Sequence, residues 1–134
     1  MTDVELMQAA EKARESAYSP YSDFKVGAAL LTKSGKVYVG CNIENASFTP
    51  TVCAERVAFF EAVKSGERAF EAIAIVGGKA GEPPTFCSPC GVCRQVMAEF
   101  CQKDFRILLG TKEDFKSYTF GELFPLSFSP ENLK

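Results

Sequence analysis

The spacing of apolar residues at the start of the chain is that of a helix. A capping box, Thr2-Asp3-Val4-Glu5, opens the segment, and apolar positions then recur every three or four residues. This pattern predicts an amphipathic helix over 3–17. Ser19-Pro20 and the polar residues after it favour turn conformations, so the helix should end before them.

Two strand-like segments come next, at 24–31 and 36–43, with the turn Lys33-Ser34-Gly35 between them. They predict a β-hairpin. The first strand contains three consecutive small residues, Gly27-Ala28-Ala29. We therefore expect something to pack closely on it, either a ligand or the next helix of the chain.

The remaining apolar pattern alternates between helix and strand. Helices are predicted at 52–64 and 91–101, strands at 70–76 and 105–109, and a loop rich in glycine and proline at 77–85. Strands that alternate with helices predict an α/β protein with a layered sheet. No repeat or linker interrupts the pattern, so we expect one domain over 1–134.

Composition narrows the classes of partner. With 134 residues and 46% hydrophobic content the chain can fill a core of its own. A net charge of −2 argues against a nucleic acid held by its phosphates, which needs a basic surface. The first 18 residues form a charged helical pattern rather than a secretory signal, and no apolar run approaches ~20 residues. We expect a small substrate, no membrane partner and a cytoplasmic location.

Six cysteines in so short a chain could form disulfides. In the reducing compartment expected here, metal binding or catalysis is the more frequent use of cysteine. Cys41, on a predicted strand, and Cys101, at the end of a predicted helix, are expected to be small core residues.

Three of the cysteines form a candidate metal site. Cys53 precedes one apolar-periodic run, and Cys90 and Cys93 precede another. Each apolar run predicts a helix, so the thiols lie at two helix N-termini, where the thiolate form is favoured. Three protein ligands with a fourth position open is the pattern of a catalytic rather than a structural zinc. Glu55 can then point at a water in the open position, and Arg56 adds positive charge beside the thiolates.

Spacing alone leaves the ligand set open. In Cys87-x-x-Cys90-x-x-Cys93 the first cysteine could replace the last, or close a four-ligand structural site. An iron–sulfur cluster fits less well, because the bacterial run needs a further cysteine followed by proline, and none follows Cys93.

The motifs C-A-E at 53–55 and P-C-x-x-C-R-Q at 89–95 resemble the cytidine deaminase family, specifically its short homotetrameric nucleoside deaminases. Zinc deaminases more widely begin this signature with His-x-Glu; a cysteine stands there in this chain, which has no histidine. The resemblance implies one Zn²⁺ per chain on Cys53, Cys90 and Cys93, with Cys87 unassigned. It also implies a three-layer α/β/α fold with a mixed sheet of about five strands flanked by helices.

The resemblance also assigns a substrate site. By composition, 42–47 is a polar loop tip with asparagines as turn residues. The family instead implies that Asn42 and Glu44 hydrogen-bond the ribose hydroxyls and that Phe24 and Ala54 contact the nucleoside. The Glu44 carboxylate would repel a sugar phosphate, so a free nucleoside is expected.

The apolar C-terminal segment 120–131 has two interpretations. It could dock on its own core, as buried phenylalanines usually do. Its sequence L-F-P-x-x-F-x-P-E resembles the closing motif of the family, which implies that Phe128 enters the active site of a neighbouring subunit in a homotetramer. Phe48 stands where the family usually carries tyrosine in the same inter-subunit region, so a hydroxyl is absent there.

The expected activity is zinc-dependent hydrolytic deamination of cytidine and deoxycytidine, with release of ammonia, in pyrimidine salvage. Glu55 is the expected proton carrier. Blasticidin-type deaminases share the cysteine motifs, but Asn42, Glu44 and Phe128 favour a simple nucleoside. A nucleic-acid-editing deaminase would need a basic surface lined with aromatic residues, which the charge balance does not offer.

Overall fold

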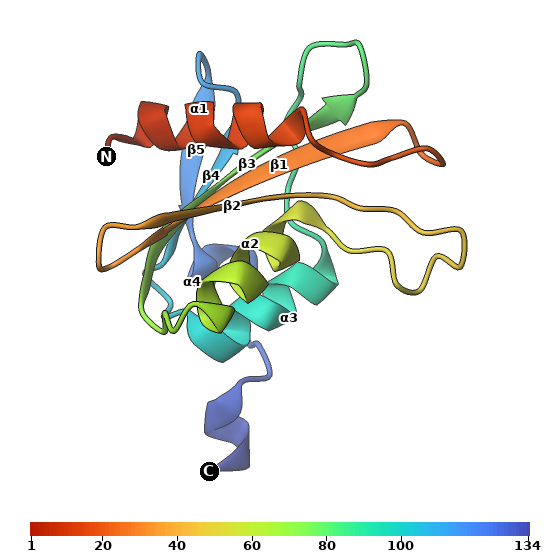
Figure 1. Ribbon diagram of the computed structural model, residues 1–134. Coiled ribbons are helices and arrows are strands. Elements are labelled where there is room, and N and C mark those ends of the chain that lie inside the picture. Colours follow the sequence, from red (N-terminus) through yellow and green to blue (C-terminus); the bar gives the residue numbers. More distant parts are fainter.

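The computed structural model describes residues 1–134 and shows a mixed five-stranded sheet between helices (Figure 1). The strand order is β2-β1-β3-β4-β5; β3 and β4 are parallel, and the other neighbours are antiparallel. In chain order the elements are α1 (Asp3–Arg14), β1 (Phe24–Thr32), β2 (Val37–Cys41), α2 (Ala54–Lys64), β3 (Phe70–Lys79), α3 (Gly91–Phe100), β4 (Arg106–Gly110), β5 (Phe115–Thr119), α4 (Phe120–Leu123) and the 3-10 helix η1 (Pro130–Leu133).

Helices cover both faces of the sheet. Helix α1 lies on one face, and α2 and α3 lie on the other (Figure 1). Alternate side chains of β1 and β3 enter two separate cores: Ala29, Ala74 and Val76 pack with α1, whereas Ala28, Ile73 and Ile75 pack with α2 and α3. This period of two is what a strand covered on both faces requires. The predicted three-layer α/β/α fold is confirmed.

The small residues of β1 serve two different helices. A Cβ added to Gly27 would lie 2.8 Å from Arg14 Cα of α1, which leaves no room for a side chain. Ala28 points to the opposite face, into the core that contains Ala54 and Ala58 of α2. Helix α2, which follows the hairpin, therefore packs on Ala28, as one of the two alternatives predicted. The close approach of α1 is the reason why Gly27 has no side chain.

Two sheet elements differ from the sequence prediction. Strand β3 continues through Gly77 and Gly78 to Lys79, where we predicted a loop, because these glycines pair with Val26 and Lys25 of β1. The family resemblance implied about five strands, but the sequence pattern gave no residue range for β5. This element is a five-residue edge strand whose side chains are partly buried or exposed.

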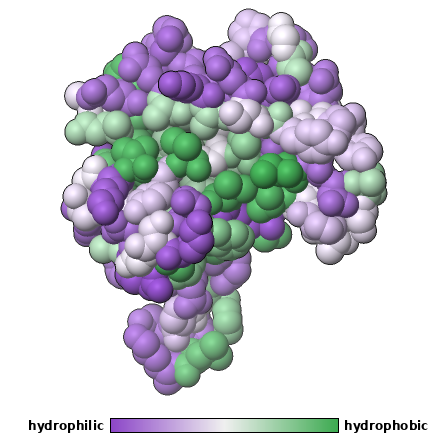
Figure 2. Space-filling view, in the orientation of Figure 1, coloured by the Kyte–Doolittle hydropathy of each residue, from purple (hydrophilic) through white to green (hydrophobic).

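The surface reflects this layering. Hydrophilic residues cover α1, and hydrophobic residues gather in a band below it, on the side of α2 and α3 (Figure 2). The C-terminal segment with η1 extends away from the body of the molecule (Figure 1). None of the helices combines the length and hydropathy needed to cross a bilayer.

Candidate active site

Two helix N-termini bring the three predicted cysteine ligands together. Cys53 is the N-cap of α2, and Cys90 is the N-cap of α3, where its sulfur accepts from the Cys93 backbone N–H at 3.5 Å. Cys93 is buried in the first turn of α3. Helix α2 begins two residues after the predicted boundary and α3 begins at it, because local capping and apolar periodicity determine where they start.

The sulfur separations fit a zinc ion. Cys53 Sγ and Cys90 Sγ lie 3.6 Å apart, and Cys90 Sγ and Cys93 Sγ lie 3.5 Å apart. All three sulfurs lie within 4.8 Å of one another. A tetrahedral ion with Zn–S bonds near 2.3 Å would hold its sulfurs about 3.8 Å apart. All six cysteines are free, so no disulfide competes for these thiols. The cluster therefore fits one Zn²⁺ per chain, with one coordination position left open.

The charges around the cluster favour a thiolate. Arg56 Nη2 donates to Cys53 Sγ at 3.3 Å. Hydrogen bonding from the Cys93 thiol, together with Arg56, lowers the pKa of Cys53 to about 5. The pKa of Cys93 is raised, because its proton is held by Cys53 and its side chain is buried. The Arg56 guanidinium thus favours the thiolate form of Cys53.

Glu55 is one of only three buried polar or charged residues of the chain. It is 4% exposed, and burial raises its pKa to about 7. The carboxyl therefore holds and releases a proton with little bias near neutral pH. That property suits a general acid–base group and is uncommon in a carboxyl that serves only packing.

A pocket of about 270 Å³ connects this cluster to the end of the β1–β2 hairpin. Its lining includes all four residues predicted to bind substrate within one chain: Phe24, Asn42, Glu44 and Ala54. The lining also includes Cys87 and five residues that no sequence motif indicated, which are Ser22, Val26, Thr51, Val52 and Ser88.

Asn42 ties the loop after β2 to β1. Its Oδ1 accepts from Val26 N at 2.8 Å, and its Nδ2 donates to Phe24 O at 2.8 Å. The amide keeps one N–H and one lone pair free for a ligand. Asn42 therefore combines the structural role expected of a loop asparagine with the capacity to bind.

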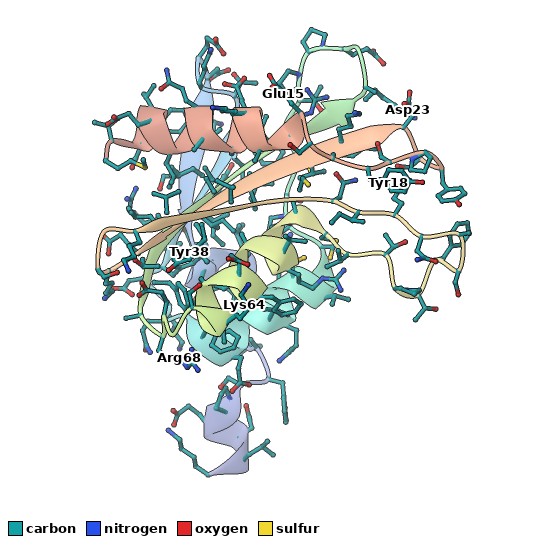
Figure 3. The ribbon with its side chains drawn as sticks, viewed as in Figure 1. Glu15, Tyr18, Asp23, Tyr38, Lys64 and Arg68 are labelled. Atoms are coloured by element: carbon teal, nitrogen blue, oxygen red, sulfur yellow. The ribbon has the colours of Figure 1, made fainter.

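Glu44 is held by the turn between α1 and β1. Its Oε1 accepts from Tyr21 N at 2.9 Å and Ser22 N at 3.1 Å, and its Oε2 accepts from the Ser22 hydroxyl. These bonds, the Ser22 hydroxyl first, lower the pKa of Glu44 below 4.5, so the group is an anion at neutral pH. Tyr18 and Asp23 both lie on this turn, and Tyr18 is hydrogen-bonded to the loop after β2 (Figure 3).

Cys87 lies in the pocket wall but outside the sulfur cluster. Burial raises its pKa to about 11, so the side chain is a neutral thiol. A Cβ on Gly77 would lie 2.8 Å from Cys87 Sγ, and this glycine of β3 therefore makes room for the thiol. Cys101 is similarly shielded, and burial raises its pKa, as expected for a core cysteine.

Two aromatic residues predicted at subunit contacts are exposed. Phe128 is 57% exposed and does not line the pocket of its own chain. Phe48 is 69% exposed, adopts a left-handed backbone conformation with φ of 57°, and contacts Tyr21 edge-on. The C-terminal segment does dock on its own core through Phe120, which is 4% exposed, but Phe128 does not fill that core.

Known proteins share this combination of fold and motif. Residues 1–109 match the family model described as the cytidine and deoxycytidylate deaminase zinc-binding region. The chain belongs to this deaminase family. A cytidine deaminase of Sporosarcina psychrophila is 50% identical over 98% of this chain and 95% of that protein.

The solved structures agree with the family. The crystal structure of a cytidine deaminase from Burkholderia pseudomallei has a TM-score of 0.87 and 46% identity, and the match covers 96% of this chain and 100% of that one.

A more distant relative by sequence, a blasticidin-S deaminase of Bacillus cereus, is 32% identical over 95% of this chain and 92% of that protein. The chain is thus similar in sequence to enzymes named for different substrates.

Proposed function

We propose that this chain is a single catalytic domain that deaminates cytidine and deoxycytidine hydrolytically, giving uridine or deoxyuridine and ammonia. The observation that carries the proposal is a buried Glu55 carboxyl next to three clustered thiols, at one end of a pocket whose other end presents Asn42 and Glu44. Chemistry on the base and recognition of the sugar thus have separate ends of one pocket.

Cys53, Cys90 and Cys93 hold the metal. Bound Zn²⁺ supplies a coordinated water whose pKa is lowered from 15.7 toward about 7. Glu55 is the group of this chain that moves protons: its carboxylate takes one proton from the attacking water and delivers it to N3 of the ring. It then takes the remaining proton from the new C4 hydroxyl and delivers it to the amine, which leaves as ammonia while the C4 carbonyl forms. No histidine exists in the chain to share this work. Arg56 offsets the negative charge that the thiolates bring to the site.

The other end of the pocket selects a free nucleoside. Ionised Glu44 can accept a hydrogen bond from a sugar hydroxyl, and the remaining N–H of Asn42 can donate to one. Phe24 and Ala54 contribute apolar contacts. A nucleoside monophosphate would bring a second anion close to Glu44, and we expect it to be a poor substrate.

We propose a homotetramer in which Phe128 completes the pocket of a neighbouring subunit. Its exposure, and its absence from the pocket of its own chain, support donation to another copy. Phe48, which is also exposed, belongs to the same inter-subunit region. We also place the enzyme in pyrimidine salvage. We propose a cytoplasmic location, since six free cysteines are typical of a reducing compartment.

Ammonia release by the wild-type enzyme tests this function. Cytidine and deoxycytidine should be substrates, whereas cytosine, which lacks the sugar, and cytidine monophosphate should be much poorer. Blasticidin S, assayed in parallel, separates the nucleoside activity from that of the more distant relative. Absence of ammonia release from cytidine by zinc-loaded protein, or equal activity on the monophosphate, would contradict the proposal.

A further inference from the structure

We propose that Ser22 is a positioning residue that couples Glu44 to Phe24 and thereby sets recognition of the sugar hydroxyl. The inference rests on the proposed nucleoside activity and adds a residue that the cysteine and glutamate motifs do not indicate. Ser22 lines the pocket together with both of its partners. It lies on the turn between α1 and β1, far from the metal-binding helices in sequence.

One hydroxyl makes both contacts. Ser22 Oγ donates to Glu44 Oε2 and accepts from Phe24 N at 3.1 Å. Ser22 Oγ has a single proton to donate. Because Oγ acts as the acceptor toward the Phe24 N–H, this proton is available for the Glu44 carboxylate. Ser22 thus fixes one end of β1 and the second oxygen of Glu44 at the same time.

The bonds to Glu44 also determine how much of it a substrate can use. A carboxylate has about four acceptor sites, two on each oxygen. Tyr21 N and Ser22 N occupy Oε1, and the Ser22 hydroxyl occupies one site on Oε2. A single site on Oε2 remains, and its direction is set by the Ser22 hydroxyl. Glu44 is therefore built to accept one hydrogen bond from one donor.

The backbone around this contact is itself fixed. Tyr18 N donates to Asn42 O, and Glu44 N donates to Tyr18 O, both at 2.9 Å. Asp23, next to Ser22, has a left-handed φ of 59°, which a non-glycine residue adopts only when its surroundings hold it. The turn is thus held to the loop after β2 by main-chain bonds, and the Ser22 hydroxyl can be removed without removing them.

The test is a comparison of two substrates in Ser22→Ala. Cytidine carries 2′- and 3′-hydroxyls, and 2′,3′-dideoxycytidine lacks both and keeps only the 5′-hydroxyl. Removing the hydroxyl should raise KM for cytidine on the order of tenfold, the size expected for one lost hydrogen bond to a charged group, with kcat little changed. The loss on 2′,3′-dideoxycytidine should be much smaller, so the ratio of the two kcat/KM values falls.

Three variants make the comparison specific. Ser22→Thr keeps a hydroxyl and should restore the wild-type ratio. Ser22→Cys keeps the size with a weaker donor and should give an intermediate ratio, and it serves as the test if Ser22→Ala folds poorly. Ser16→Ala, an exposed serine with no side-chain hydrogen bond, should leave the ratio unchanged. In Glu44→Gln, the further change Ser22→Ala should have little additional effect on KM.

The outcomes separate this inference from the proposed function. If wild-type protein neither binds cytidine in calorimetry nor releases ammonia from it, both fail. If the wild type is active but Ser22→Ala lowers kcat/KM equally for the two substrates, Ser22 is only structural and the inference alone is wrong. An unchanged ratio in a folded, zinc-loaded Ser22→Ala also overturns it.

Discussion

Gly40 tests how tightly the sheet positions the metal-binding helix. A Cβ at this position of β2 would lie 2.7 Å from Ala58 N and closer still to Ala54 O, both in the backbone of α2. Ordinary contact begins at 3.4 Å, so Gly40→Ala would push α2 away from the sheet by at least 0.7 Å. Side-chain rotation cannot relieve a clash with backbone.

The expected consequences follow from that displacement. Overpacking of this kind costs about 1–3 kcal/mol, equivalent to a fall in Tm of roughly 3–12 °C for a domain of this size. The start of α2 also carries Cys53 and Glu55, whereas Cys90 and Cys93 belong to α3. A misplacement near 1 Å can cost about 10²-fold in rate, and we expect a loss of that order in kcat/KM for cytidine.

The measurement combines thermal unfolding, zinc content and ammonia release in Gly40→Ala. Gly91→Ala is the matched control, because a Cβ there has no atom within 4 Å although Gly91 lies between two proposed ligands. The control should keep wild-type Tm and turnover. Wild-type Tm together with wild-type activity in Gly40→Ala would refute the idea that β2 fixes the position of α2.

Three further predictions concern single side chains. Cys87→Ser should leave zinc content and turnover nearly intact; loss of the metal would show that the ligand assignment is wrong. Phe128→Ala should raise KM for cytidine with little change in Tm. Phe105→Ala is the contrast, because it removes a core side chain that is 2% exposed and should cost about 3–5 kcal/mol of stability. Partial recovery of cytidine affinity when Phe128→Ala chains are mixed with Glu55→Gln chains would support donation between subunits, and no recovery after proven subunit exchange would contradict it. The pKa of Glu44 is lowered in the folded state, so the stabilising effect of its ionisation is present above pH 4.5 and is lost as pH falls through the folded-state pKa. The Tm difference between wild type and Glu44→Gln should therefore shrink below pH 4.5. A Tm difference that grows below pH 4.5 would contradict the direction of this pKa shift.

Local signals in the sequence were enough to locate the metal-binding helices. Cys53 and Cys90 each stand directly before an apolar-periodic run, and both are N-caps in the structure. The β1–β2 hairpin was equally local, since a turn separates two strand-like runs. Strand β5 was not located because its residues, Phe115–Thr119, contain no continuous apolar run and lie at a sheet edge.

Features that depend on tertiary pairing could not be predicted. Gly77 and Gly78 indicate a loop by composition, but β1 extends beside them and recruits them into β3. The contact of Ser22 with Glu44 joins residues 22 positions apart, and neither residue type reveals it. The sequence could propose which residues bind substrate, whereas the hydrogen bonds that orient them required the fold.

The most direct measurement is turnover of cytidine by zinc-loaded Glu55→Gln. The amide keeps the shape of the side chain but cannot carry protons, so zinc content should stay at one per chain while ammonia release falls by at least ~10²–10⁴-fold. A variant that retains its zinc and more than about a tenth of wild-type turnover would show that Glu55 is not the proton carrier.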